Sequence, residues 1–150
     1  MGNDNNETSF LIKEKSLSKK LKLLINNMKL KKQDAFLVPR ADMYSAEEVP
    51  DNEERLKYIS NFSGSAGYAV ISANSCVKSV IFSDGRYELQ LKKEVDPKNF
   101  DCLNGGFKEV CFFLNANEKK LKNIAIDPWL LTLKQYELLK SLLKGSKIKF

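Results

Sequence analysis

The first helix predicted by the pattern of apolar residues is amphipathic and basic. Leucine, isoleucine and methionine recur every three or four residues from Leu17 to Met28, with lysines between them, and the pattern ends near Leu30. We expect this helix to pack on a sheet rather than lie on a membrane, because no Trp or Phe marks its apolar face. Four more helices are predicted: one begun by the capping-box pair Asp51 and Glu54, one capped by Asp84, one over 107–114, and one from a cap at Thr132 to a stop at Gly145.

Short apolar or alternating runs between these helices predict strands. They lie at 35–38, 68–72, 77–82, 100–103, 124–126 and 147–150. The second and third are joined by a short turn and predict a hairpin. Because helices and strands intermingle around this hairpin, the sequence predicts one α/β domain, with a mixed β-sheet and a central hairpin flanked by helices.

Length and composition indicate a globular protein of one domain. The 150 residues are 43% hydrophobic and 29% charged. Residues 1–8 are rich in asparagine, so we expect a disordered tail before a domain over 9–150. No signal peptide and no apolar run of about 18 residues is visible, which favours a cytoplasmic protein without a membrane partner. The last predicted strand reaches the final residue, so we expect a fragment of a longer protein.

The charge does not favour nucleic-acid binding. The formal net charge is +6, but only three of the 25 basic residues are arginine, and the lysines are scattered along the chain. Proteins that bind nucleic acid favour arginine, whose guanidinium group forms two parallel hydrogen bonds, and they cluster their basic residues on one face. A solvated, lysine-rich surface is therefore the better interpretation, with no nucleic acid as partner.

The chain has no histidine, which excludes Ser-His-Asp and Cys-His nucleophile systems and histidine metal sites. Three cysteines, Cys76, Cys102 and Cys111, lie in apolar surroundings without a CxxC spacing. We expect all three to be reduced and mostly buried, acting as small hydrophobic residues, with a disulfide or a reactive thiolate as the alternative.

Two further segments allow more than one interpretation. The Gly-Ser-Ala-Gly run at 64–67 offers backbone N–H groups to a phosphate, but it precedes a strand and lacks GK(S/T), so a tight turn is favoured. Six acidic residues between Asp42 and Glu54 resemble a cation site, yet they lack the DxDxDG pattern, and capping accounts for two of them. From the residues alone, no complete catalytic constellation is visible.

Four segments, read together, resemble aminopeptidase P over about residues 20–150. They are VPRAD at 38–42 with Glu47 and Pro50, similar to VP-x-x-D-x-H-x-x-E; FSGSAG at 62–67; SDGRY at 83–87 with Leu89 and Gln90; and IDPWL at 126–130. The resemblance implies the first, creatinase-like domain of the three-domain form of this enzyme, with a ribonuclease H-like topology. It implies that a second creatinase-like domain and a pita-bread catalytic domain lie outside this chain.

The resemblance also implies a function for the whole enzyme. Aminopeptidase P is a metallopeptidase that releases an N-terminal residue preceding proline and usually holds two Mn²⁺ ions in its catalytic domain. This fragment is then expected to be inactive, with no catalytic residue, metal ligand or cofactor of its own. Its expected partners are its own catalytic domain, a peptide with proline at the second position, and a second copy in a homodimer. The residues expected near substrate or at domain contacts are Asp42, Phe62, Gly64, Ser65 and Arg86.

Two departures from the family pattern bear on substrate binding, because a substrate contact made by the family histidine would be changed or lost here. Tyr44 stands where the family often has His, and Glu48 where it often has Tyr. For Asp84 and Arg86, a local cap and anchoring ion pair is favoured over substrate contact.

For Phe62 we expect a contact surface. Burial in its own core is less easy at a glycine-rich turn, where Gly64 and Gly67 indicate positive φ or close backbone approach. The rival function is a creatinase-like module that binds peptides or histones without catalysis, although the net charge of +6 argues against histones.

Overall fold

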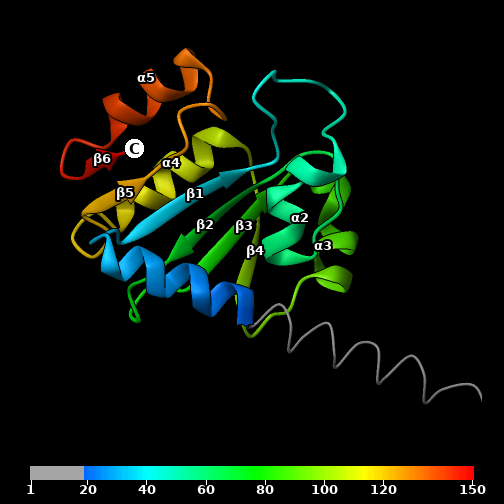
Figure 1. Cartoon of the computed structure of the whole chain (residues 1–150), viewed down its shortest axis with the longest axis horizontal. Helices are drawn as coiled ribbons and strands as arrows, with labels where there is room; N and C mark the ends of the chain where they lie inside the picture. The colour runs from blue at the N-terminus through cyan, green and yellow to red at the C-terminus, as the bar shows by residue number, and fades with distance from the viewer. Residues whose placement is uncertain (1–18) are drawn as a thin grey trace, which may run out of the picture.

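The computed structural model describes residues 19–150, which form a six-stranded mixed sheet between two layers of helices (Figure 1). The strand order is β4-β3-β2-β1-β5-β6. The strands are β1 (Ala35–Pro39), β2 (Tyr68–Ser72), β3 (Ser79–Ser83), β4 (Phe100–Asn104), β5 (Asn123–Ala125) and β6 (Lys147–Lys149). The predicted mixed α/β class and the central hairpin, β2–β3, are confirmed.

The direction of the strands decides where the loops meet. Only β2 runs against its neighbours, whereas β1, β5 and β6 are parallel to one another and β3 is parallel to β4. The C-terminal ends of five strands therefore lie at the same edge of the sheet, together with the start of β2. We call this the carboxyl edge.

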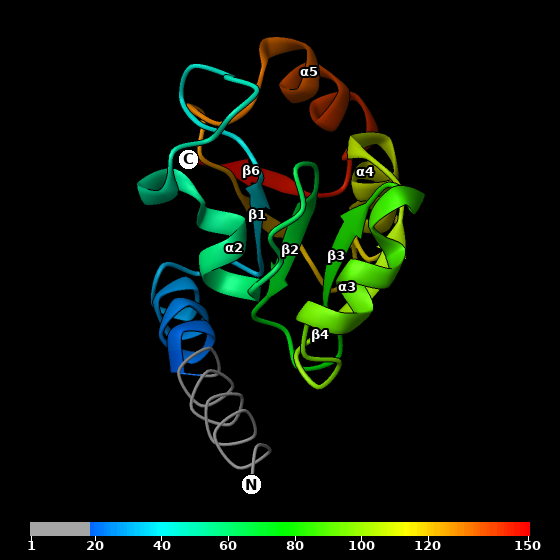
Figure 2. The same cartoon turned by 90° about the vertical axis from the view of Figure 1, so that its right-hand side faces the viewer.

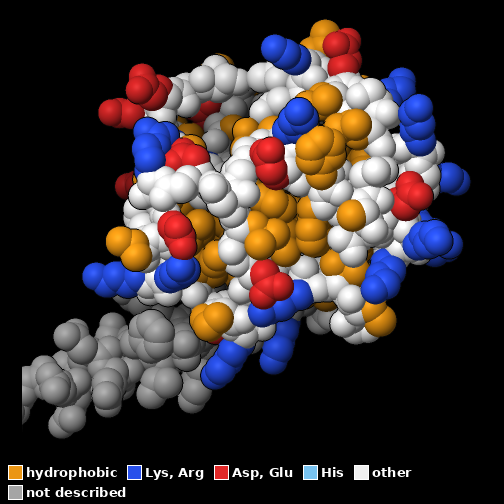
Figure 3. All heavy atoms as spheres, turned by 180° about the vertical axis from the view of Figure 1, so that it is seen from behind, with side chains coloured by type: hydrophobic (Ala, Val, Ile, Leu, Met, Phe, Trp, Pro, Cys, Tyr) orange, Lys and Arg blue, Asp and Glu red, His pale blue; other side chains and the backbone are white. Residues whose placement is uncertain are grey.

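Each face of the sheet carries its own hydrophobic core. A helical segment at 19–30, α2 (Arg55–Ser60) and α3 (Glu88–Glu94) cover one face, and α4 (Phe107–Ala116) and α5 (Leu133–Leu142) cover the other (Figure 2). Figure 3 views the molecule from behind the sheet of Figure 1 and shows hydrophobic side chains at the centre of that face, with charged side chains around them.

The hairpin residues alternate between the two cores. Val70 and Phe82 pack on the side of α4, whereas Ala69, Ile71 and Ile81 pack on the side of α2. A strand that is covered on both faces needs apolar residues at successive positions, which is the pattern of the central strands.

Of the three side-chain caps predicted at helix starts, two are confirmed. Asp84 accepts a hydrogen bond from the backbone N–H of Arg86 at the start of the 3₁₀ turn η2 (Gly85–Tyr87), and Thr132 accepts one from Gln135 at the start of α5. The capping box at Asp51 is wrong: a 3₁₀ turn, η1 (Asp51–Glu53), precedes α2, and neither start has a side-chain cap. The carboxylate of Glu54 is instead paired with Arg40.

The prediction for the cysteines is partly wrong. All three are free thiols, but only Cys111 is buried, while Cys102 is half-buried and Cys76 is exposed. Cys76 lies in the turn between β2 and β3, where its N–H donates to Oδ1 of Asn74, so its apolar neighbours in sequence do not cover it. The expected tail at 1–8 and the first residues of the first helix lie outside the described residues.

Candidate functional site

The carboxyl edge brings the segments 38–42, 62–67 and 83–87 side by side. Pro39 pairs with Tyr68, and Tyr68 pairs with Phe82 across the hairpin. Just beyond these pairs, the N–H of Arg40 donates to the carbonyl of Gly67 at 2.9 Å. The fourth segment, 126–130, begins directly after β5, at the same edge. Residues far apart in sequence thus form one group of loops.

Phe62 forms the floor of the glycine-rich loop 62–67. Its side chain is only 1% exposed and belongs to the core beneath α2 and α3, with an edge-to-face contact to Tyr87. A Cβ at position 64 would overlap the Phe62 ring, and a Cβ at Gly67 would lie 3.1 Å from it. The expectation that Phe62 is not easily buried is therefore wrong. Neither glycine has a positive φ, so close approach is the reason for both.

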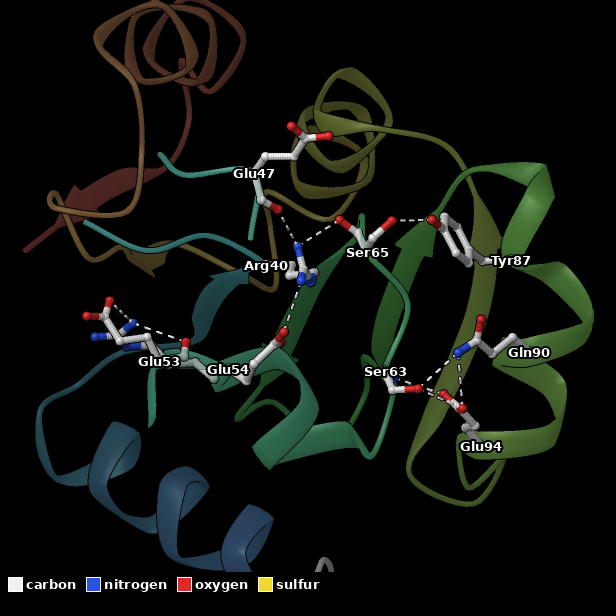
Figure 4. Close-up of polar contacts among 10 residues, drawn as sticks. Arg40, Glu47, Glu53, Glu54, Ser63, Ser65, Tyr87, Gln90 and Glu94 are labelled. Carbon is white, nitrogen blue, oxygen red and sulfur yellow. Dashed lines mark hydrogen bonds and ion pairs between the residues drawn. The ribbon is translucent and has the colours of Figure 1, made fainter. Parts of the chain in front are cut away.

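Glu94 holds one end of this loop from α3. Its carboxylate accepts hydrogen bonds from the backbone N–H and the hydroxyl of Ser63, each at 2.8 Å (Figure 4). Gln90, one turn earlier, donates to the Ser63 hydroxyl at 2.9 Å and to Glu94 at 3.1 Å. The loop therefore enters its turn at a fixed position relative to α3.

Arg40 holds the other end. Its Nη1 donates to the carbonyl of Ser65 at 3.0 Å and, more weakly, to that of Glu47 at 3.5 Å. Its Nη2 pairs with Glu54 at 3.0 Å, and both side chains of that pair are largely buried. Because one guanidinium contacts three segments of chain, Arg40 ties the loop 40–50 and the start of α2 to the glycine-rich loop (Figure 4).

Ser65 lies at the tip of the loop with an exposed side chain. Its hydroxyl is hydrogen-bonded to the hydroxyl of Tyr87 from η2. This contact links the glycine-rich loop to the segment that contains Asp84 and Arg86. The tip therefore presents a hydroxyl pair to solvent on a backbone that is held at both ends.

Asp42 shapes the neighbouring loop from inside. It is 2% exposed, and its Oδ1 accepts hydrogen bonds from the N–H groups of Tyr44 at 3.0 Å and Ala46 at 2.8 Å. Tyr44, at the position where the family often has His, is exposed. The geometry therefore gives Asp42 a structural role within the loop. The exposed side chain of this segment is that of Tyr44.

Asp84 and Arg86 form the predicted ion pair. Nε of Arg86 lies 3.0 Å from Oδ1 and Nη2 lies 2.8 Å from Oδ2, which is a two-pronged contact. The hydrogen bonds from Arg86 lower the pKa of Asp84, and the same pair raises the pKa of Arg86. A hollow of about 180 Å³ is lined by Asp84, Asn104 and Cys102, among others.

The polar groups at the carboxyl edge are hydroxyl and backbone groups and carboxylates that already have partners. Within residues 19–150, no group of three or more His, Cys, Asp or Glu side chains is placed to hold a metal ion. The carboxylates of Asp42, Glu54, Asp84 and Glu94 are each engaged by backbone N–H groups or arginine or hydroxyl donors. Hydroxyl and backbone groups on a fixed loop can bind a polar chain such as a peptide.

The family follows from comparison with known sequences. Residues 20–150 match the family model described as the creatinase/prolidase N-terminal domain. The chain belongs to this family. The four segments lie within the matched region, and all four lie at the carboxyl edge of the fold.

The similar curated proteins are Xaa-Pro aminopeptidases. Xaa-Pro aminopeptidase 1 of Dictyostelium discoideum is 32% identical over 136 residues, which is 89% of this chain and 21% of that protein. A probable Xaa-Pro aminopeptidase P of Laccaria bicolor is 38% identical over 107 residues, 69% of this chain and 16% of that protein. The chain thus spans about a fifth of the length of these relatives.

Solved structures agree with this assignment. An X-Pro aminopeptidase from Thermotoga maritima has a TM-score of 0.67 at 26% identity, over 85% of this chain and 32% of that one. The X-prolyl aminopeptidase of Caenorhabditis elegans, described as a cytosolic enzyme with a di-nuclear active site, has a TM-score of 0.64 at 27% identity, over 78% of this chain and 19% of that one. In the described part of the present chain, no helix has the length and apolar character needed to cross a membrane.

The structure brings some of the predicted site residues together. Phe62, Gly64 and Ser65 share one loop, and Arg86 is one residue from Tyr87, which contacts that loop. Asp42 contacts only its own loop in the hydrogen bonds described above. Sequence reasoning missed Arg40 and Glu94, the two residues that hold the loop. A signal for Arg40 was its place among only three arginines in a lysine-rich chain.

Proposed function

We propose that this chain is the non-catalytic N-terminal domain of a Xaa-Pro aminopeptidase, a metallopeptidase that releases an N-terminal residue preceding proline. The observation that carries the proposal is the match to the N-terminal domain family, together with relatives that are Xaa-Pro aminopeptidases about five times as long. The whole enzyme would add a second creatinase-like domain and a pita-bread catalytic domain with two Mn²⁺ ions. It would act in the cytoplasm, which the relative described as a cytosolic enzyme supports, and it would form a homodimer.

The role of the domain would be to shape the entrance of the active site. The glycine-rich loop supports this role, because it is held by Arg40 and Glu94 while the Ser65 hydroxyl stays exposed. A fixed loop loses little entropy when a peptide binds to it. Contact with substrate or with the catalytic domain would therefore pass through the tip at Ser65.

The first test uses the 150-residue chain. With no histidine and no clustered ligands among residues 19–150, titration with Mn²⁺ in a calorimeter should give no stoichiometric binding, and Xaa-Pro peptides should remain intact. Micromolar binding of one or two Mn²⁺ ions, or cleavage that follows added Mn²⁺, would contradict the non-catalytic role.

The second test uses the full-length protein. Ser65→Ala should raise KM for Xaa-Pro peptides, with kcat/KM lowered by about threefold to tenfold, the size of one lost polar contact. The matched control is Ser141→Ala, since Ser141 is exposed on α5 and bonds only to its own helix. Equal values of kcat/KM for the Ser65→Ala and Ser141→Ala variants would contradict a role for the loop tip at the active-site entrance.

A further inference from the structure

An apolar groove lies on the face of the sheet that carries α2 and reaches the segment 126–130 at the carboxyl edge. Its walls are the helical segment 19–30 and α2, its floor is β1, and one end is closed by the connection after β5. The volume is about 340 Å³. Leu23 and Tyr58 are 57% and 61% exposed on its walls. Apolar surface of this kind, open on a domain this small, marks a binding site for another surface.

The charges around the groove favour an acidic occupant. Lys20 lies at the rim with its Nζ 4.0 Å from the centre of the Tyr58 ring, and Arg55, which is paired with Glu53 at 3.5 Å, also lines the groove. Among residues 19–150, Asp127 is the one acidic residue that lines the groove, and its Oδ1 accepts a hydrogen bond from the N–H of Trp129. An apolar segment flanked by Asp or Glu would therefore complement this rim.

The path of the chain points to the source of that segment. The last strand, β6, lies beside β5, and the N–H of Ile126 donates to the carbonyl of Lys149 at 3.0 Å. The chain thus brings Lys149 beside Ile126, next to the groove-lining Asp127, while the Phe150 ring packs on Tyr136 of α5. Figure 2 shows the C-terminal end on the side of the sheet that carries α2 and the helical segment 19–30. Residues that follow Phe150 would enter the groove without crossing the sheet.

We propose that in the full-length protein this groove seats an apolar, acid-flanked segment of the polypeptide that follows Phe150. The inference rests on the proposed function, because that function implies a longer chain, as do relatives of about five times this length. A tethered segment has a high effective concentration, so modest contacts keep it bound. The docked segment would fix the orientation of this domain relative to the rest of the enzyme.

The test measures thiol labelling at two positions of the first helix. Leu23→Cys reports on the groove, and Leu30→Cys is the matched control, because Leu30 is 82% exposed on the same helix and does not line the groove. Each variant is made in the 150-residue chain and in the full-length protein, and labelling is read for each peptide by mass spectrometry. In the full-length protein, labelling at 23 should slow by about tenfold or more, while labelling at 30 stays unchanged.

Equal labelling at position 23 in the two proteins would overturn the proposal. Protection that arises in the 150-residue chain as its concentration rises would also overturn it, because a second copy would then be the occupant. Adding Lys20→Glu to the full-length Leu23→Cys protein should restore fast labelling, and unchanged protection would refute the acidic flank. Cleavage of Xaa-Pro peptides is measured on the same samples: protection without cleavage contradicts the proposed function alone, and cleavage without protection contradicts the docking alone.

Discussion

Replacing Phe62 by alanine should destabilise this domain strongly, because the ring is part of the core. The side chain is 1% exposed, contacts Tyr87 edge to face, and supports the backbone at Gly64 and Gly67. Truncation of a buried Phe to Ala costs about 3–5 kcal/mol, the sum of lost transfer free energy and the cavity that remains. For a domain of this length, each kcal/mol lowers the melting temperature by about 2–4 °C, so a fall on the order of 10 °C is expected.

The assay is thermal or urea unfolding of the 150-residue chain. Phe112→Ala is the matched control, since Phe112 is 48% exposed on α4, and its loss should cost less than about 1 kcal/mol. If Phe62→Ala melts within a few degrees of the wild type, or no lower than Phe112→Ala, the placement of the ring beneath the loop is wrong. Phe62 would then be a contact residue, as the sequence had indicated.

Three further predictions concern the loop, the thiols and acid stability. Gly64→Ala should cost about 1–3 kcal/mol in urea unfolding, because its Cβ would overlap the Phe62 ring, whereas Gly85→Ala should cost much less, since its nearest neighbour would be 3.9 Å away. At pH 8, Cys76 should react first with a thiol reagent, while burial raises the pKa of Cys111 to about 11 and keeps it unreactive in the folded chain. Asp84→Asn should lower the melting temperature above pH 3.8, the ordinary pKa of this carboxyl, and the difference should vanish as the pH falls through the lowered pKa of the folded state. Fast labelling of Cys111, or a difference at Asp84 that persists at pH 2, would contradict these two assignments.

The parts of the fold that depend on local sequence were predictable. The β2–β3 hairpin and the caps at Asp84 and Thr132 involve residues a few positions apart, so periodicity and capping rules predicted them. The capping box at Asp51 failed because Glu54 is held by Arg40, 14 residues away. A local rule does not include such a competing partner.

The site was predictable as segments but not as a surface. The resemblance indicated the segments at 38–42, 62–67 and 83–87, and the sheet order then placed them at one edge. The contact between Arg40 and the Ser65 carbonyl spans 25 residues, and that between Glu94 and Ser63 spans 31. Neither follows from spacing along the chain. Phe62 was misjudged for a related reason, since glycine at 64 leaves the space that the ring fills.

The most direct test of the account is the activity of the full-length protein on paired peptides. Purified protein is incubated with Mn²⁺ and with two tripeptides that differ only in proline or alanine at the second position, and release of the first residue is measured. The account predicts release from the proline peptide, with kcat/KM at least about 100-fold above the alanine peptide, and no release by the 150-residue chain. Release from neither peptide, with binding of the intact proline peptide, would contradict it and identify a binding module instead.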